Sequence, residues 1–240
     1  NLVWRNRRRK SNVSKEEKVK RSCMSGTRSS TKRTRESSEA DTSETDQVRT
    51  EHDTMGPIRV PANALYGAQT QRAIHHFVVG ANHSLMPIAI IHAIALIKSA
   101  AATTNEALGK LDARRARAIE GAARAVHTGE HDDAFPLPVY ISGSGTQSNM
   151  NVNEVIAKLA NATLLAQPSE PQDAAAPGLK VHPNDHVNAS QSTNDVFPSA
   201  IHVAAAIKLA GELDPLLEVV IELLEKRAET YKNVFKVGRT

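Results

Sequence analysis

The chain has 240 residues, with 30 Lys and Arg against 26 Asp and Glu, and a single cysteine, Cys23. This length allows one large domain with a tail, and one cysteine excludes an internal disulfide framework and favours a reducing, cytoplasmic compartment. No run of about 18 uncharged apolar residues occurs, because the best candidate, residues 88–97, is short and ends at Lys98, so we expect no membrane-spanning segment.

The positive charge is concentrated at the N-terminus. Residues 1–50 carry a net charge of +7, and residues 51–240 carry a net charge of −3. Thirteen of the 30 residues from Arg21 to Thr50 are Ser or Thr, so this segment buries too little apolar surface to offset chain entropy, and we predict a disordered tail over residues 1–50. The acidic remainder gives no electrostatic support for nucleic-acid binding. Since the sequence begins with Asn1, Met24 is a candidate for the native start.

From residue 51 the pattern becomes that of a mainly α-helical protein with few strands. Residues 55–61 combine a glycine and two prolines with alternating apolar residues, which indicates an extended or turn segment. A first long helix is predicted from Ser84, with Pro87 in its first turn, to Gly109, because apolar residues recur on one face between these positions.

Two further helices and a loop follow. Asp112 is typical of an N-cap and Gly129 of a helix end, which predicts a second helix between them. A third helix is expected over residues 147–165. Three prolines indicate a loop over residues 167–178.

The last predicted helical segment covers residues 193–237, with Pro198 and Pro215 marking starts or kinks. Its acidic residues form one narrow stripe: Glu218, Glu222, Glu225 and Glu229. Because most of the remaining circumference is apolar, we expect this helix to be buried among several others. The rest of the sequence offers too few helices to enclose it, so we expect the natural chain to continue, to oligomerise through this helix, or both.

Three polar clusters are candidates for chemistry. The first, residues 143–149, places glycines and hydroxyls before a helix, where free backbone N–H groups favour an anion. The alternative is a glycine-rich turn with a hydroxyl cap. The third cluster, residues 190–195, is typical of an N-cap for the following helix.

The second cluster contains two histidines with the i, i+4 spacing of a metal-binding pair, His182 and His186. Nothing marks a third ligand, and Pro183 argues against a helix through the pair, so we expect a turn or an anion-contacting loop and no metal. Together the three clusters offer many neutral donors and few cations. Such a set suits a small dicarboxylate whose charge is redistributed during a reaction.

Seven strings of this sequence match, in order, those of one known family. They are Glu51–Gly56, Gly67–Arg72, His131–Pro136, Gly143–Asn153, His182–Asp185, Gln191–Asp195 and Gly238–Thr240. On these strings the chain, from about Val48 to Thr240, resembles class II fumarate hydratase of the aspartase/fumarase superfamily. Aspartate ammonia-lyase of the same superfamily is the alternative, because His186 and the string Gln191–Asp195 are more aspartase-like.

The resemblance implies a fold, a reaction and a set of contacts. Residues 51–190 would form an N-terminal lyase domain, and residues 191–240 would begin a central helical bundle. The reaction would be the reversible hydration of fumarate to (S)-malate in the tricarboxylic acid cycle, without metal or organic cofactor. The implied substrate contacts are Ser144, Gly145, Thr146, Ser192, Thr193, Asn194 and Thr240. A second dicarboxylate site is implied at His182, Pro183, Asn184 and Asp185.

In the family a catalytic histidine follows the Gly-Arg-Thr string, and a catalytic serine lies in a loop far downstream. We therefore expect no catalytic residue within these 240 residues, and we expect the chain alone to be an inactive, aggregation-prone fragment. The resemblance also implies a homotetramer with active sites shared among subunits. The competing interpretation is a non-enzymatic interaction protein, whose basic tail binds polyanions and whose apolar C-terminal helix docks partners.

Overall fold

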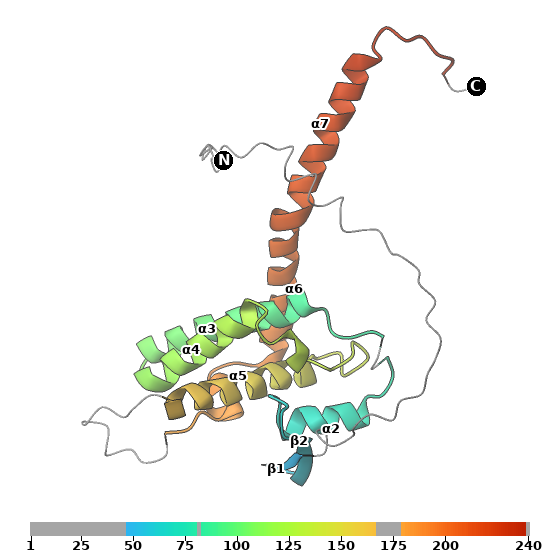
Figure 1. Cartoon of the computed structure of the whole chain (residues 1–240). Coiled ribbons are helices and arrows are strands. Elements are labelled where there is room, and N and C mark those ends of the chain that lie inside the picture. Colours follow the sequence, from blue (N-terminus) through green and yellow to red (C-terminus); the bar gives the residue numbers. More distant parts are fainter. Residues whose placement is uncertain (1–46, 81–82, 167–178, 239–240) are drawn as a thin grey trace. The chain divides into compact units, whose positions relative to one another are not determined.

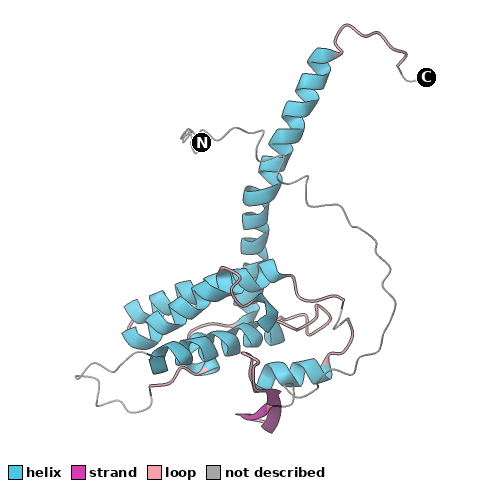
Figure 2. Ribbon diagram, viewed as in Figure 1, coloured by secondary structure: helices cyan, strands magenta, loops and turns pink. Residues whose placement is uncertain are grey.

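The computed structural model describes residues 47–80, 83–166 and 179–238, which belong to one compact unit. Helices dominate this described part of the chain, and one small hairpin accompanies them (Figures 1 and 2). Three predicted features lie outside the described residues: most of the tail, the loop at 167–178, and Thr240.

The hairpin consists of β1 (Val48–Asp53) and β2 (Gly56–Pro61), which pair antiparallel. The prediction of an extended segment over residues 55–61 is confirmed by β2. β1 begins three residues inside the segment predicted to be disordered, because its residues alternate between exposed and half-buried once β2 pairs with them. Gly56, at the closing turn, has a φ of +105°, a conformation that glycine adopts readily.

The core is built from four long helices: α3 (Ile88–Ala107), α4 (Ala113–His127), α5 (Thr146–Ala166) and α6 (Thr193–Lys208). α3 packs against α4, α5 and α6, and α4 also packs against α5. Figure 1 shows α3, α4 and α5 lying alongside one another. Ile94, Ile119 and Val155, one from each of these helices, are completely buried. The predicted mainly α architecture is therefore confirmed.

The helix ends follow the predicted caps, with one difference. Asp112 accepts a hydrogen bond from the Arg115 N–H as the N-cap of α4, and Gly109 has the positive φ of a residue just after a helix end. Ser84 does not open α3. Its carbonyl accepts from the Val139 N–H, and the adjacent Leu85 forms a β-bridge with Pro138, so the helix begins only at Ile88.

The C-terminal helical segment contains an irregular turn. α6 passes into a π-helical turn, η4 (Leu209–Leu213), and then into α7 (Asp214–Thr230), which ends before the predicted residue 237. At η4 the Asp214 N–H donates to the carbonyl of Leu209, five residues earlier. Pro215 explains this turn, because a proline has no N–H and its ring clashes with the carbonyl four residues before it.

The expectation that the last helix is buried is not met within the single chain. No residue of α7 is buried, and its large aliphatic side chains between Leu216 and Leu224 are 44–64% exposed. Figure 1 shows α7 running away from α3, α4 and α5. By length and hydropathy alone, α3 and the segment Thr193–Thr230 also qualify as candidate membrane spans, a test that core helices of soluble proteins pass as well. The sequence analysis expected none.

A short helix that the sequence analysis did not predict, α2 (Ala68–His76), is held by a carboxylate from α5. Its N-cap is Gly67, which has no side chain to cap the first turn. Glu154 accepts from the N–H groups of Gly67, Gln69 and Thr70 at 2.9, 2.8 and 3.1 Å, and from the Thr70 hydroxyl at 2.6 Å. A negative charge at a helix N-terminus is favourable, so this buried contact ties α2 to the core.

Replacement of Glu154 by alanine leaves these N–H groups without an acceptor in a buried place. We expect Glu154→Ala to lower the free energy of unfolding by about 3 kcal/mol and to abolish hydrogen-exchange protection of the Thr70 amide. Lys158→Ala, one turn later on α5 and exposed, should change stability by less than about 0.5 kcal/mol. Urea denaturation and amide exchange measure both effects, and equal stability of the two variants would contradict this role of Glu154.

Candidate functional site

The first predicted cluster lies on a loop that leads directly into the N-terminus of α5. The hydroxyl of Ser144 lies 3.2 Å from that of Ser142 and 3.0 Å from that of Thr146, so three hydroxyls form a connected row. Ser144 and Thr146 are exposed, whereas Gly145 between them is buried. A ligand at this place would meet hydroxyl groups together with the free N–H groups of the first turn of α5.

Gly145 is buried because the aromatic ring of Phe197 packs onto its backbone. Its φ is +73°, and a Cβ atom added there would lie 2.1 Å from Cγ of Phe197. Since Phe197 belongs to the first turns of α6, this contact brings the loop of the first cluster against the start of α6.

The third predicted cluster occupies the N-terminus of α6. Ser192 is the N-cap, and its hydroxyl oxygen accepts from the Asn194 N–H at 3.2 Å. Asn149 of α5 donates through Nδ2 to the Thr193 hydroxyl oxygen at 2.9 Å. The prediction of an N-capping cluster is confirmed. The structure thus joins the first and third clusters, by a hydrogen bond and by the packing of Phe197 on Gly145.

Behind these two loops lies a buried polar junction centred on Asn188. Its Oδ1 accepts from Lys98 Nζ at 2.9 Å, from Asn149 Nδ2 at 3.1 Å and from Asn153 Nδ2 at 3.3 Å. Its Nδ2 donates to the carbonyl of Gln191 at 3.1 Å. One side chain therefore connects α3 and α5 with the loop that precedes α6.

Lys98 is the charged residue of this junction, and the sequence analysis missed it as a candidate. Its side chain is completely buried, and burial lowers its pKa to about 7. A signal was present in the sequence. Lys98 lies four residues after Ile94 and four before Ala102, so it falls on the apolar stripe that α3 turns toward the core.

The second predicted cluster forms a single π-helical turn, η3 (Pro183–Val187), with Pro183 at its first position. A proline is tolerated there because the first N–H groups of a helix have no intrahelical partner. His182 is the extended N-cap and lies outside this single turn, so no helix runs through the histidine pair, in line with the prediction from Pro183. The Nδ1 atom of His182 accepts from the Asp185 N–H at 3.3 Å, and that of His186 accepts from the His182 N–H at 2.7 Å. Burial, together with the charge of Arg115, lowers the pKa of His186.

Both histidine Nδ1 atoms thus serve as backbone acceptors and are not directed at a common ligand. Within the described parts of the chain, no group of three His, Cys, Asp or Glu residues is arranged to hold a metal ion. The side chains of His182 and His186 therefore stabilise the turn that was predicted for this cluster.

The same turn borders a pocket of about 560 Å³. His182, Pro183 and Asn184 line it, together with the cations Arg49, Lys158 and Lys180 and the carboxylates Glu51, Asp53 and Glu154. Asp185 is the fourth residue predicted for a second dicarboxylate site, and it is exposed, with its carboxylate 3.1 Å from His182 Nδ1.

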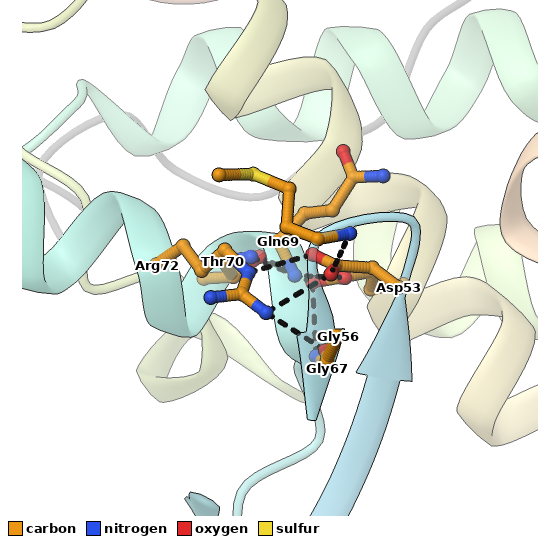
Figure 3. A network of polar contacts seen from close by, with 8 residues as sticks. Asp53, Gly56, Gly67, Gln69, Thr70 and Arg72 are labelled. Atoms are coloured by element: carbon orange, nitrogen blue, oxygen red, sulfur yellow. Dashed lines mark hydrogen bonds and ion pairs between the residues drawn. The ribbon is translucent and has the colours of Figure 1, made fainter. Parts of the chain in front are cut away.

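A larger pocket of about 660 Å³ lies between the hairpin, α2 and the start of α5, where Thr146 is one of its lining residues. Arg72 of α2 also lines it. Figure 3 shows the Arg72 guanidinium reaching Asp53, at 2.9 and 3.0 Å, and the carbonyl of Gly56, at 2.8 Å. The hydrogen bonds from Arg72 hold the pKa of Asp53 below its usual value. Arg72 is thus paired with a carboxylate and anchors the hairpin turn.

Because Phe197 packs directly on Gly145, the stability of the protein should depend strongly on which residue occupies position 145. We expect Gly145→Ala to destabilise the protein by about 2–4 kcal/mol, because the new methyl group overlaps the ring and the φ disfavours alanine. The matched control is Gly143→Ala in the same loop, where an added Cβ meets no atom within 4 Å and stability should change by less than about 0.5 kcal/mol. Equal midpoints in urea denaturation would contradict this packing.

The buried amine of Lys98 predicts a pH dependence of stability. The unfolded chain keeps the Lys98 proton up to about pH 10, whereas the folded chain releases it near pH 7. The unfolded state therefore binds more protons in that window, and stability rises with pH, by about 1.4 kcal/mol per pH unit at most. Denaturation between pH 7 and 9 should show this rise relative to Lys98→Met. The exposed-lysine control Lys158→Met should retain it, and parallel curves for the wild type and Lys98→Met would contradict the prediction.

Comparison with known proteins shows the family to which this chain is similar. A family model described as Lyase matches residues 56–240. The class II fumarate hydratases of Chromobacterium violaceum and Nitrosomonas europaea are 50% identical over 196 residues and 48% identical over 195 residues. These alignments cover 82% and 81% of this chain, but the chain spans only 41% and 40% of the length of these curated relatives.

Solved structures agree in fold. The class II fumarase of Schistosoma mansoni matches with a TM-score of 0.74 and 41% identity, over 81% of this chain and 39% of that one. The fumarate lyase:delta crystallin of Brucella melitensis matches with a TM-score of 0.71 and 35% identity, over 81% and 40%. The predicted fumarase/aspartase-like fold is confirmed. Since the family match extends over residues 56–240 and includes both hydroxyl-bearing loops, this chain belongs to the lyase family.

Proposed function

We propose that this chain carries the dicarboxylate-binding loops of a class II fumarate hydratase, which adds water reversibly across fumarate to give (S)-malate. The observation that carries the proposal is the joining of two hydroxyl-bearing helix N-termini, through Gly145 on Phe197 and through Asn149 on Thr193. The relatives named class II fumarate hydratase support it, at 48–50% identity, and favour hydration over the ammonia-lyase alternative.

The chemistry of the two loops suits this reaction. Removal of a proton from the carbon beside a carboxylate places extra negative charge on that carboxylate in the transition state. Hydroxyl and N–H donors at the N-termini of α5 and α6 stabilise this additional charge. A fixed cation would bind the carboxylate of the substrate as strongly as that of the transition state, and would therefore accelerate the reaction less. We assign this role to Ser144, Gly145, Thr146, Ser192, Thr193 and Asn194, with Thr240 as a further contact from outside the described residues.

A second dicarboxylate site is proposed at the turn η3, where His182, Pro183 and Asn184 line the pocket of about 560 Å³. Lys158 and Lys180 line the same pocket and supply positive charge for a carboxylate, since the carboxylates of the lining are engaged by Arg49, Arg72 and the N-terminus of α2. Asp185 is the fourth residue of this proposed site, and its N–H donates to His182 Nδ1, which holds the turn in place.

The complete active site is proposed to form in a homotetramer. The chain spans 40–41% of the length of its relatives, so the remaining catalytic groups are proposed to come from other parts of such an enzyme. The exposed aliphatic side chains of α7 support assembly, because a monomer rarely leaves so large an apolar surface in water.

A complementation assay tests the proposal. The chain would be co-expressed with the part of a class II fumarate hydratase relative that it does not cover, and fumarate would be followed by its absorbance. We expect hydration from the two parts together and none from either alone, and no ammonia release from aspartate. Thr146→Val should lower kcat/KM by about a hundredfold, because a donor to the charged transition state is lost.

The matched control is Thr163→Val on the same helix, whose hydroxyl is exposed and donates to its own helix at the Leu159 carbonyl. This variant should keep the rate of the wild type. If the two variants Thr146→Val and Thr163→Val hydrate fumarate equally fast in the complementation assay, the assignment of substrate contacts to the loop before α5 is refuted.

A further inference from the structure

The Asn188 junction joins a buried cation to one of the proposed substrate contacts. Three donors converge on Asn188 Oδ1, and the shortest of these contacts, at 2.9 Å, is the one from Lys98 Nζ. A carbonyl oxygen has two lone pairs, so the donors compete for them. A bond from an ammonium group is stronger than one from a neutral amide, and Lys98 therefore sets the position of the Asn188 oxygen.

The neutral partners of Asn188 depend on this position. Asn149 Oδ1 and Asn153 Oδ1 are buried, and within the described structure they have no hydrogen-bond partner. The amide group of each side chain is thus oriented from its nitrogen side alone. Both Nδ2 groups donate to Asn188, Asn149 also donates to Thr193, and Asn153 also donates to Met150 Sδ at 3.5 Å. Because a side chain held at one end follows its acceptor, a shift of the Asn188 oxygen would move Asn149.

Asn149 in turn determines where the proton of Thr193 points. The Thr193 hydroxyl oxygen accepts from Asn149 Nδ2 at 2.9 Å. A hydroxyl that accepts on one side donates its own proton in another direction, and Thr193 is only partly buried. The proton is therefore directed away from the junction, and a ligand on the open side can accept it.

We propose that Lys98 is a positioning residue for the dicarboxylate site, acting through Asn188 and Asn149 to fix the direction in which the Thr193 hydroxyl donates. The contact between Thr193 and substrate rests on the proposed function, whereas the relay from Lys98 to Thr193 does not. Lys98 itself is completely buried, so its effect on a ligand at the open side of Thr193 is indirect.

Four ionisable groups on the elements packed around Lys98 are either paired elsewhere or exposed. On α5, Glu154 caps α2, and Lys158 is exposed. On α4, His127 contacts the carbonyl of His92, and on α6, Asp195 is exposed beside Ser199.

His186 lies two residues before Asn188, and burial, together with the charge of Arg115, places its pKa below the ordinary value of 6.5. Burial alone lowers the pKa of Lys98, to about 7. A response of Thr193 and Asn149 with a midpoint near 7 that disappears when Lys98 alone is replaced therefore reports Lys98.

The test uses nuclear magnetic resonance on the 240-residue chain with Lys98→Met and Lys98→Gln. Methionine removes both the donor and the charge, and fills a similar volume without the desolvation cost of an amine, so the fold should persist. We expect Lys98→Met to accelerate exchange of the Gln191 amide, which donates to the Asn188 carbonyl, roughly tenfold or more, and to move the Asn149 side-chain signals.

Lys98→Gln restores a neutral donor and should recover this protection. In the wild type the Thr193 methyl and Asn149 amide signals should titrate with a midpoint near pH 7, and this titration should be absent in both variants. The matched control is Ile94→Val, one turn earlier on the same buried face, which perturbs packing without touching Asn188.

Unchanged Gln191 exchange in Lys98→Met would overturn the proposal, as would an equal effect of Ile94→Val. If Lys98→Met does not fold, the proposal is tested with the wild type and Lys98→Gln. In that case, the absence of a titration near pH 7 in the Thr193 and Asn149 signals of the wild type would overturn it. The complementation assay separates this inference from the proposed function. If the resonance experiments show the relay but the complementation assay shows no fumarate hydration, the inference about Lys98 holds and the proposed function is refuted.

Discussion

The satisfaction of buried polar groups is the constraint on which this structure depends. α5 presents a row of buried polar side chains to the core, among them Asn149, Asn153 and Glu154, where an ordinary helix would present apolar ones. Each costs free energy unless it finds a partner. Glu154 finds its partners at the start of α2, and the Nδ2 groups of the two asparagines find theirs in Asn188, whereas their Oδ1 atoms have no partner within the described structure. Hydrogen bonds from the polar side chains of α5 thus fix the positions of α2, beside the hairpin, and of the loop before α6. Apolar side chains pack around these contacts.

Local signals in the sequence were enough to predict the elements that cap themselves. Asp112 and Gly109 determine helix ends through their own side chain or backbone, and both were identified. α2 was missed because its first turn is satisfied by Glu154, more than eighty residues away. The start of α3 was misplaced for the same kind of reason, since Ser84 is held by Val139 in a contact that no local pattern reveals.

The residues of the candidate site were found by type, but their arrangement was not. Glycines and hydroxyls before two helices identified both loops, and nothing in either loop indicates that they meet. Their contact depends on one missing side chain, at Gly145, which lets Phe197 approach the backbone. The spacing of His182 and His186 could not show that both Nδ1 atoms accept backbone N–H groups and so stabilise the turn.

The turn at η4 has a consequence for how the C-terminal segment presents its surfaces. A π-helical turn inserts one residue relative to an α-helix, which rotates everything after it by about 100° around the axis. Without this insertion, the apolar face that carries Val196 and Ala200 on α6 would continue into the acidic stripe of α7, at Glu218 and Glu222. With the extra residue, the same side continues instead into Val219 and Leu223. The irregular turn before Pro215 thus keeps an apolar surface on one side of both segments, so that a neighbour packed along α6 can continue along α7.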